Sequence, residues 1–296
     1  MLSGFHHVTA ISGDPRATIE FYTGFLGMRL VKRTVNFDDP GTHHFYFGGP
    51  AGEPGTLLTL FPWPTPRRAR VGAGQPIEVA FETGSLRFWN ERAAAYDVER
   101  TAEGVEFGER VLGLRDSFGM AIKLVERAAG PNALGRLHGV TICETDPAGL
   151  AAVLTDLLGF KRTGTEGQRQ RFELAGGAAR IDLWPASTPE RGKAGPGAIH
   201  HVAWRVESEA EQDEWRARLM AAGLRVSIPQ NRLYFRSIYF RAHRGVLFEI
   251  ATVSPGFTFD EPWDALGGKL CLPPWLEPER ASIEARLAPL DAAVIR

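Results

Sequence analysis

The chain has 296 residues, of which 44% are hydrophobic and 23% are charged. This length suggests two domains, and the composition is that of a globular protein rather than of a disordered, collagen-like or coiled-coil chain. With 34 Lys and Arg residues against 35 Asp and Glu residues, the formal net charge is −1, so nothing in the charge predicts a nucleic acid or an anionic membrane as partner.

The sequence also lacks the usual signals of export and of membrane insertion. No hydrophobic run approaches the roughly 18 residues of a membrane span, and the first residues have neither a basic leader nor an apolar signal core. We therefore expect a cytoplasmic protein whose partners are small molecules. The two cysteines, Cys143 and Cys271, are too few for a disulfide framework and are interpreted as free thiols. A homo-oligomer is compatible with the sequence, which does not define the oligomeric state.

Short segments of alternating hydrophobicity recur along the chain, at residues 4–10, 75–81, 136–142 and 198–204. The first and third copies match closely, because Phe5-His-His-Val-Thr corresponds to Leu137-His-Gly-Val-Thr. A helical pattern follows in each copy, for example at 15–26 and at 209–222, where Gly223 is a predicted C-cap. Three strand patterns complete the copy, in the first case at 29–36, 43–48 and 55–61. The sequence therefore predicts four βαβββ modules.

Connections rich in proline and glycine separate the modules, at 62–76, 127–136 and 185–197. A single module would expose the apolar face of its sheet, so we predict an α+β fold in which the four modules pair into two cupped mixed sheets. The predicted organisation is a first domain at 1–130 (modules 1–66 and 75–127), a second at 131–253 (modules 136–185 and 198–253) and a C-terminal arm at 254–296. The arm is predicted to pack against the rest of the chain and to become helical from about Glu277.

Because the modules are copies, positions that differ between them can be compared within the one chain. On the first strand, the first module has His7 and the fourth has His201, whereas the third has Gly139 and the second has Glu78 or Val79. On the last strand, one position differs in all four modules, which hold Thr59, Lys123, Asp182 and Glu249.

If the first and fourth modules share a cup, then His7, His201 and Glu249 converge, and Thr59 leaves the fourth equivalent position without a ligand. Two imidazoles and one carboxylate form the facial triad of non-haem Fe(II) oxygenases, and these ligand types also suit Mn(II). Lys123 cannot ligate a metal, so we predict one metal per chain.

Each predicted histidine ligand follows another histidine, in the pairs His6-His7 and His200-His201. Neighbouring strand residues point to opposite faces, so one member of each pair must support the site rather than bind the ion. His6 aligns with His138, in a module without a site, which favours His7 and His201 as the ligands. A shift of the assignment by one residue remains the alternative.

Several of these segments together are typical of a known family. They are Gly4-Phe-His-His-Val-Thr, Ile199-His-His-Val-Ala-Trp, Asn231-Arg-Leu-Tyr-Phe-Arg-Ser-Ile-Tyr and Gly245-Val-Leu-Phe-Glu. From about residue 4 to residue 267 the chain resembles the vicinal-oxygen-chelate superfamily of glyoxalases, bleomycin-resistance proteins and extradiol dioxygenases. Within it, the chain is similar to the ring-cleaving dioxygenases that act on hydroquinones.

The resemblance implies that His7, His201 and Glu249 bind Fe(II). It also implies that the substrate side of the pocket is lined by four further residues, His6, His200, Arg232 and Tyr239. The residue types support two of these roles, because Arg232 offers a fixed cationic fork and Tyr239 a hydroxyl that can hold or release a proton. Tyr239 lies ten residues before Glu249, as expected for adjacent antiparallel strands joined by a turn at 242–245.

We therefore predict an Fe(II)-dependent dioxygenase, with Mn(II) as the alternative metal, that inserts both atoms of O2 into a small aromatic diol. The resemblance favours a hydroquinone over a catechol. One alternative is a glyoxalase-type isomerase or lyase, which would require a fourth protein ligand where Thr59 stands. The other is a metal-free protein that binds, and confers resistance to, a flat aromatic compound.

Overall fold

The computed structural model describes residues 1–65, 67–127, 130, 132–187 and 190–290. Parts of the predicted connections and the end of the predicted arm, at 66, 128–129, 131, 188–189 and 291–296, lie outside the described residues. Within the described ranges, no helix is both long enough and apolar enough to cross a membrane.

The βαβββ module occurs four times, as predicted. The first module consists of β1 Phe5–Ser12, α1 Pro15–Ile19 with a π-helical extension Glu20–Phe25, β2 Arg29–Asn36, β3 Asp39–Gly48 and β4 Leu57–Pro62. The second consists of β5 Gln75–Thr83, α2 Leu86–Ala95, β6 Arg100–Glu106, β7 Glu109–Arg115 and β8 Ala121–Glu126. The third consists of β9 Leu134–Glu144, α3 Pro147–Ala152 with a π-helical extension Val153–Leu157, β10 Lys161–Glu166, β11 Arg169–Glu173 and β12 Arg180–Pro185. The fourth consists of β13 Ile199–Val206, α4 Glu209–Ala221, β14 Gln230–Asn231, β15 Arg236–Arg241 and β16 Leu247–Thr252.

The helices show how the local sequence defines the module. The Ser208 hydroxyl accepts a hydrogen bond from the Glu211 amide and caps the N-terminus of α4. Trp215 and Leu219, one turn apart, are buried against the sheet. The C-cap residue is Ala222, and Gly223 follows it with a φ of 83° that glycine adopts easily. The glycine predicted to end the helix therefore lies one position after the cap.

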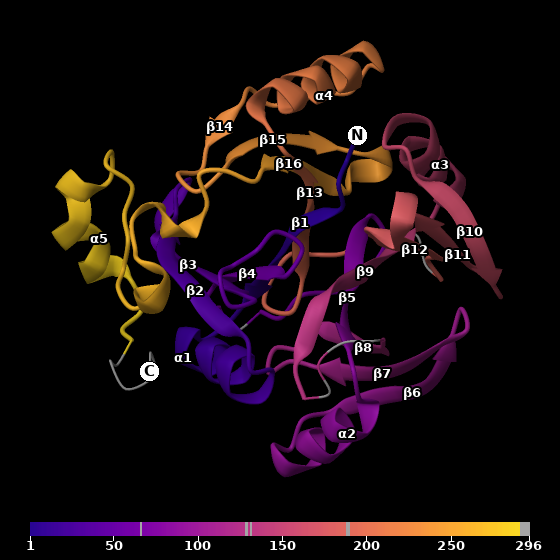
Figure 1. The fold of residues 1–296 in the computed structure, drawn as a ribbon, viewed down its shortest axis with the longest axis horizontal. Coiled ribbons are helices and arrows are strands. Elements are labelled where there is room, and N and C mark those ends of the chain that lie inside the picture. Colours follow the sequence, from indigo (N-terminus) through magenta and orange to yellow (C-terminus); the bar gives the residue numbers. More distant parts are fainter. Residues whose placement is uncertain (66, 128–129, 131, 188–189, 291–296) are drawn as a thin grey trace.

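The modules form two curled eight-stranded mixed sheets with the helices on their outer faces (Figure 1), and the predicted fold class is confirmed. The first sheet has the order β14-β15-β16-β13-β1-β4-β3-β2 and joins the fourth module to the first. The second has the order β10-β11-β12-β9-β5-β8-β7-β6 and joins the third module to the second. Each sheet therefore takes one module from residues 1–130 and one from residues 131–253, with the two modules meeting through antiparallel first strands, β1 with β13 and β5 with β9.

The described part of the C-terminal arm packs along the edge strand β2, on the outside of the first sheet (Figure 1). The Cys271 amide donates a hydrogen bond to the Arg33 carbonyl, and Lys32 is fully buried in ion pairs with Asp260 and Glu261. The predicted helix begins with a 3-10 turn at Glu277–Glu279 and continues as α5 Arg280–Arg286, whose Ile283 is buried against Val35 and Leu272. The arm is thus a packing element, as predicted, and it closes an exposed sheet edge.

Candidate metal centre

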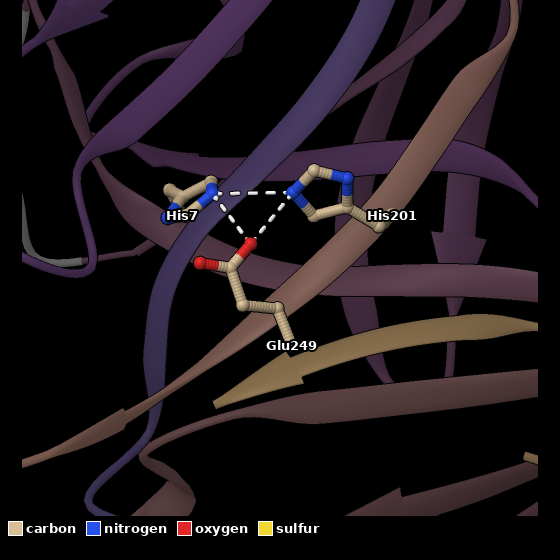
Figure 2. Close-up of side chains that lie close together, drawn as sticks. All are labelled: His7, His201 and Glu249. Carbon is tan, nitrogen blue, oxygen red and sulfur yellow. Dashed lines mark hydrogen bonds and ion pairs between the residues drawn. The ribbon is translucent and has the colours of Figure 1, made fainter. Parts of the chain in front are cut away.

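Three side chains of the first sheet point toward one another, each from the third residue of its strand, on β1, β13 and β16 (Figure 2). His7 Nε2 lies 3.3 Å from His201 Nε2, and Glu249 Oε2 lies 2.9 Å from His201 Nε2 and 3.4 Å from His7 Nε2. The register explains this convergence, because His7 and Glu249 both lie opposite Ala203, on the two strands that flank β13. His201 is two residues from Ala203 and therefore points to the same face.

The three atoms have the chemistry expected of metal ligands. The Glu249 side chain is 1% exposed, and its Oε2 atom accepts no hydrogen bond, although its Oε1 atom accepts one from the Ser237 hydroxyl. A buried carboxylate oxygen without a donor is unfavourable unless something else compensates its charge. The separations suit one ion at the roughly 2.0–2.2 Å typical of nitrogen and oxygen ligands.

The first histidine of the N-terminal pair determines the tautomer of the second. His6 Nε2 lies 3.1 Å from the carbonyl oxygen of Thr252, which can only accept, so this nitrogen carries the proton. Burial and the adjacent His7 lower the pKa of His6 to about 3, so its Nδ1 atom is an unprotonated acceptor. His7 Nδ1, 2.8 Å away, therefore donates to it. This leaves the lone pair of His7 on Nε2, which faces His201 and Glu249, an arrangement common in metal sites.

The second pair repeats this contact, with His200 Nδ1 2.7 Å from His201 Nδ1. Partial burial and the adjacent His201 lower the pKa of His200, and burial likewise lowers the pKa of His201. If His201 donates from Nδ1 to His200, its Nε2 lone pair also faces the centre.

The fourth equivalent position holds Thr59, whose hydroxyl is engaged elsewhere. It lies 2.8 Å from the Thr9 hydroxyl and 2.9 Å from His44 Nε2. His44 points from β3 toward the cavity, and burial together with the neighbouring His7 and His201 lowers its pKa well below the ordinary value. This face therefore carries three side chains that could ligate a metal and a neutral imidazole beside the open side.

A cavity of about 470 Å³ lies over the three ligands. Its floor is the triad, and Phe61, Trp63 and Phe235 contribute aromatic walls. Tyr239 lies directly opposite Glu249 in the register of β15 and β16, so the predicted strand–turn–strand arrangement is confirmed.

Arg232 and Tyr239 are in direct contact on the cavity wall. Arg232 Nε donates to the Tyr239 hydroxyl over 3.1 Å, and Arg232 Nη2 donates to Asp38 over 2.9 Å. Burial and the nearby Glu249 raise the pKa of Tyr239 above its ordinary value, so the hydroxyl retains its proton at neutral pH. Because the Tyr239 oxygen already accepts from Arg232, its own proton remains available to a molecule in the cavity.

The structure brings His7, His201 and Glu249 together, and it places His200, Arg232 and Tyr239 on the cavity wall. Contrary to what the resemblance implied, His6 is not among the residues that line the cavity. It lies behind His7, where the module comparison expected a supporting residue, and its ring packs 4.8 Å from that of Phe235. Three functional candidates escaped the prediction of site residues, namely Asp38, His44 and Ser237. For Ser237 the available signal was its position two residues before Tyr239, which places both on one face of the strand.

Comparison with known proteins agrees with this geometry. Residues 4–124 and 136–250 match the model of the Glyoxalase/Bleomycin resistance protein/Dioxygenase superfamily. The chain belongs to this superfamily. It is 38% identical over 302 residues to MhqO of Bacillus subtilis, named a ring-cleaving dioxygenase, with 97% of this chain and 96% of the relative covered. It is 30% identical over 302 residues to the chlorohydroquinone/hydroquinone 1,2-dioxygenase of Sphingobium indicum, with 93% of each covered.

Solved structures of superfamily members extend the likeness to three dimensions. The crystal structure of a Bacillus subtilis protein described as a dioxygenase superposes with a TM-score of 0.92 at 39% identity, covering 98% of both chains. Glyoxalase I from Zea mays superposes with a TM-score of 0.66 at 16% identity, covering 85% of this chain and 92% of the maize enzyme. The second likeness shows the shared fold alone.

Proposed function

We propose that this superfamily member is an Fe(II)-dependent ring-cleaving dioxygenase that inserts both atoms of O2 into a small aromatic diol, preferably a hydroquinone, with Mn(II) as the alternative metal. The observation that carries the proposal is the three-ligand centre, in which His7, His201 and Glu249 converge while Thr59 is engaged by Thr9 and His44. A facial triad leaves positions open for substrate and O2. The names of the relatives support the same reaction class.

The bound metal would supply the redox chemistry and a common site for the diol and O2. The protein would supply the remaining functions. Phe61, Trp63 and Phe235 would hold the flat ring by apolar and aromatic contact.

Proton transfer would be the task of the polar wall. Neutral His44 can accept a hydrogen bond from a phenolic hydroxyl, and the Tyr239 hydroxyl can donate a proton to an oxygen that becomes anionic. Arg232 would stabilise negative charge on that oxygen, directly or through Tyr239, with which it is already hydrogen-bonded. His200 would orient His201 and face the substrate.

The experiment is oxygen uptake by protein loaded anaerobically with Fe(II) and given methylhydroquinone, chlorohydroquinone or catechol, with bound metal measured in parallel. We expect hydroquinone-dependent uptake that is lost in His7→Ala, His201→Ala and Glu249→Ala. His243→Ala is the matched control, because this partly exposed histidine pairs with Asp146 away from the cavity.

The other outcomes separate the alternatives. Preference for catechol would keep the reaction and change the substrate. One bound metal without uptake, together with turnover of a glutathione thioester or hemithioacetal, would favour the isomerase. Tight binding of aromatic compounds without any metal would favour the binding protein.

A further inference from the structure

The cavity opens to solvent beside the turn that joins β2 to β3. This turn includes Asp38, whose amide donates a hydrogen bond to the Asn36 side chain and so shapes the turn. The Asp38 side chain is 70% exposed, whereas that of Glu249 on the cavity floor is 1% exposed. Since both residues line the same cavity, Asp38 marks its mouth.

Arg232 reaches the mouth from the opposite module, just after β14. Its side chain is 17% exposed, and its guanidinium bridges the Asp38 carboxylate and the Tyr239 hydroxyl. Desolvation lowers the pKa of Arg232, but Tyr239 and Asp38 outweigh it and raise the pKa above its ordinary value. The first and fourth modules are thus joined across the mouth by a charged pair, and the guanidinium that faces the cavity already has an anionic partner.

The charges along the cavity wall are few. Among the described residues that line the cavity, Arg232 is the one Lys or Arg, while Asp38 and Glu249 are the acidic residues. Glu249 is a ligand in the proposed centre, so a substituent at the mouth meets Arg232 and Asp38 together. A carboxylate there would have to displace Asp38 from Arg232 or lie beside it, which is unfavourable for like charges. An uncharged substituent neither displaces Asp38 from Arg232 nor is repelled by the Asp38 carboxylate.

We propose that Asp38 is a specificity-determining residue that makes the cavity select uncharged aromatic diols over diols bearing a carboxylate. This inference rests on the proposed function, whose substrate class it narrows. Asp38 acts through Arg232, because it neutralises the one guanidinium that could otherwise recognise an acidic substituent. Asp38 therefore selects by disfavouring the carboxylate, not by adding a favourable contact to the uncharged diol.

The test uses two ligands that differ in charge but hardly in shape, (2,5-dihydroxyphenyl)acetate and (2,5-dihydroxyphenyl)acetamide. Their dissociation constants are measured by calorimetry on metal-loaded protein under anaerobic conditions, so that no turnover is required. We expect the wild type to bind the amide at least about tenfold more tightly than the carboxylate. Asp38→Asn should reduce this ratio by about tenfold or more, because a charge-assisted hydrogen bond to Arg232 becomes available to the ligand.

Two variants serve as controls for charge and position. Asp38→Glu retains the carboxylate and should retain the discrimination. Asp39→Asn removes the same charge one residue along the chain, where the Asp39 side chain accepts from Thr42 and does not contact Arg232, so the ratio should stay as in the wild type. Adding Arg232→Gln to Asp38→Asn should abolish the gained affinity for the carboxylate.

Equal binding of the two ligands by the wild type would overturn the inference, as would an unchanged ratio in Asp38→Asn or an equal change in Asp39→Asn. Absence of binding of either ligand would reject the proposed diol site and the inference with it. The expected binding ratios without oxygen uptake from any diol would reject the proposed reaction while supporting the selection by Asp38.

Discussion

The two sheets have equivalent backbone positions on their concave faces, but different side chains occupy these positions. In the first sheet β1 and β16 flank Ala203, and in the second β9 and β8 flank Ala80 in the same register. Three equivalent positions around these alanines hold His7, His201 and Glu249 in the first sheet and Gly139, Glu78 and Lys123 in the second. The fold therefore provides the positions, and the side chains decide whether they form a metal centre.

At the equivalent positions, the second sheet pairs its charged side chains with one another. Lys123 Nζ lies 2.6 Å from Glu78 Oε1 and 2.6 Å from Glu106 Oε2. Asp182, which stands where the first sheet has Thr59, accepts two hydrogen bonds from Arg171. The Lys123 ammonium has no lone pair for a metal and already neutralises the two carboxylates beside it, whereas Glu249 Oε2 in the first sheet lacks a hydrogen-bond donor. At these equivalent positions, a buried carboxylate oxygen without a donor distinguishes the candidate site from its counterpart in the second sheet.

The largest effect is expected when the first sheet is given the residue type that the second sheet has at the equivalent position, lysine at 249 as at Lys123. Glu249→Lys removes a ligand and places an ammonium where no equivalent of Glu78 or Glu106 exists. We expect loss of metal and of oxygen uptake, and a decrease of about 3–5 kcal/mol in the free energy of unfolding, because a buried charge is left without a partner. Metal analysis and urea unfolding measure both effects. Retention of the metal would show that Glu249 is not a ligand.

The reciprocal test removes the cation from the second sheet. Lys123→Met leaves the carboxylates of Glu78 and Glu106 close together without their shared partner, and we expect a loss of about 3 kcal/mol in unfolding free energy. Metal content and activity should stay as in the wild type, since the first sheet is untouched. Lys161→Met, at an exposed position, is the control for loss of a lysine. A decrease in bound metal would contradict the independence of the two sheets.

A smaller effect is expected from a residue that orients the carboxylate. Ser237 donates to Glu249 Oε1, and the equivalent position in the second sheet holds Val111, opposite Val125 in the register where Ser237 lies opposite Ala251. Ser237→Ala should weaken metal binding by about 10–100-fold, as is typical when a partner of a ligand is lost. Titration of the metal-free protein with Fe(II) or Mn(II) measures the change. Unaltered affinity would mean that the strand alone orients Glu249.

The module comparison could predict much of this arrangement because equivalent residues of a repeated unit occupy equivalent backbone positions. It identified His7, His201 and Glu249 as the converging set before any pairing of strands was known. It also favoured a supporting role for His6, but it could not identify the hydrogen bond of His6 to Thr252, 246 residues away. A contact between residues so far apart in the chain leaves no pattern in the local sequence.

The mouth of the cavity was equally inaccessible to sequence reasoning. Asp38 and Arg232 are separated by 194 residues and lie in segments without a strong periodic pattern. Likewise, the division of the chain at about residue 130 follows its linear order, whereas each sheet draws on both halves. The pairing of first strands across the chain determines the sheets, and this depends on tertiary packing rather than on local propensity.

The smallest expected effect is the loss, in acid, of the stability that the ion pairs of the second sheet contribute. Burial raises the pKa of Glu109, but His138 and Arg171 outweigh burial and lower it from 4.5 to about 2. A carboxyl group whose pKa is lower in the folded state contributes stability that is present above pH 4.5 and is lost as the pH falls toward 2. Between pH 5 and pH 3.5, the wild type should therefore lose about 1 kcal/mol more unfolding free energy than Glu109→Gln.

Urea unfolding of the metal-free protein at several pH values measures this difference without interference from ligand protonation at the metal centre. Glu91→Gln is the matched control, because Glu91 is largely exposed and pairs only with Arg87 on its own helix among the contacts described. Its pH dependence should follow that of the wild type. If Glu109→Gln also followed the wild type, the ion pairs of Glu109 with His138 and Arg171 would not contribute to the stability of the second sheet in acid.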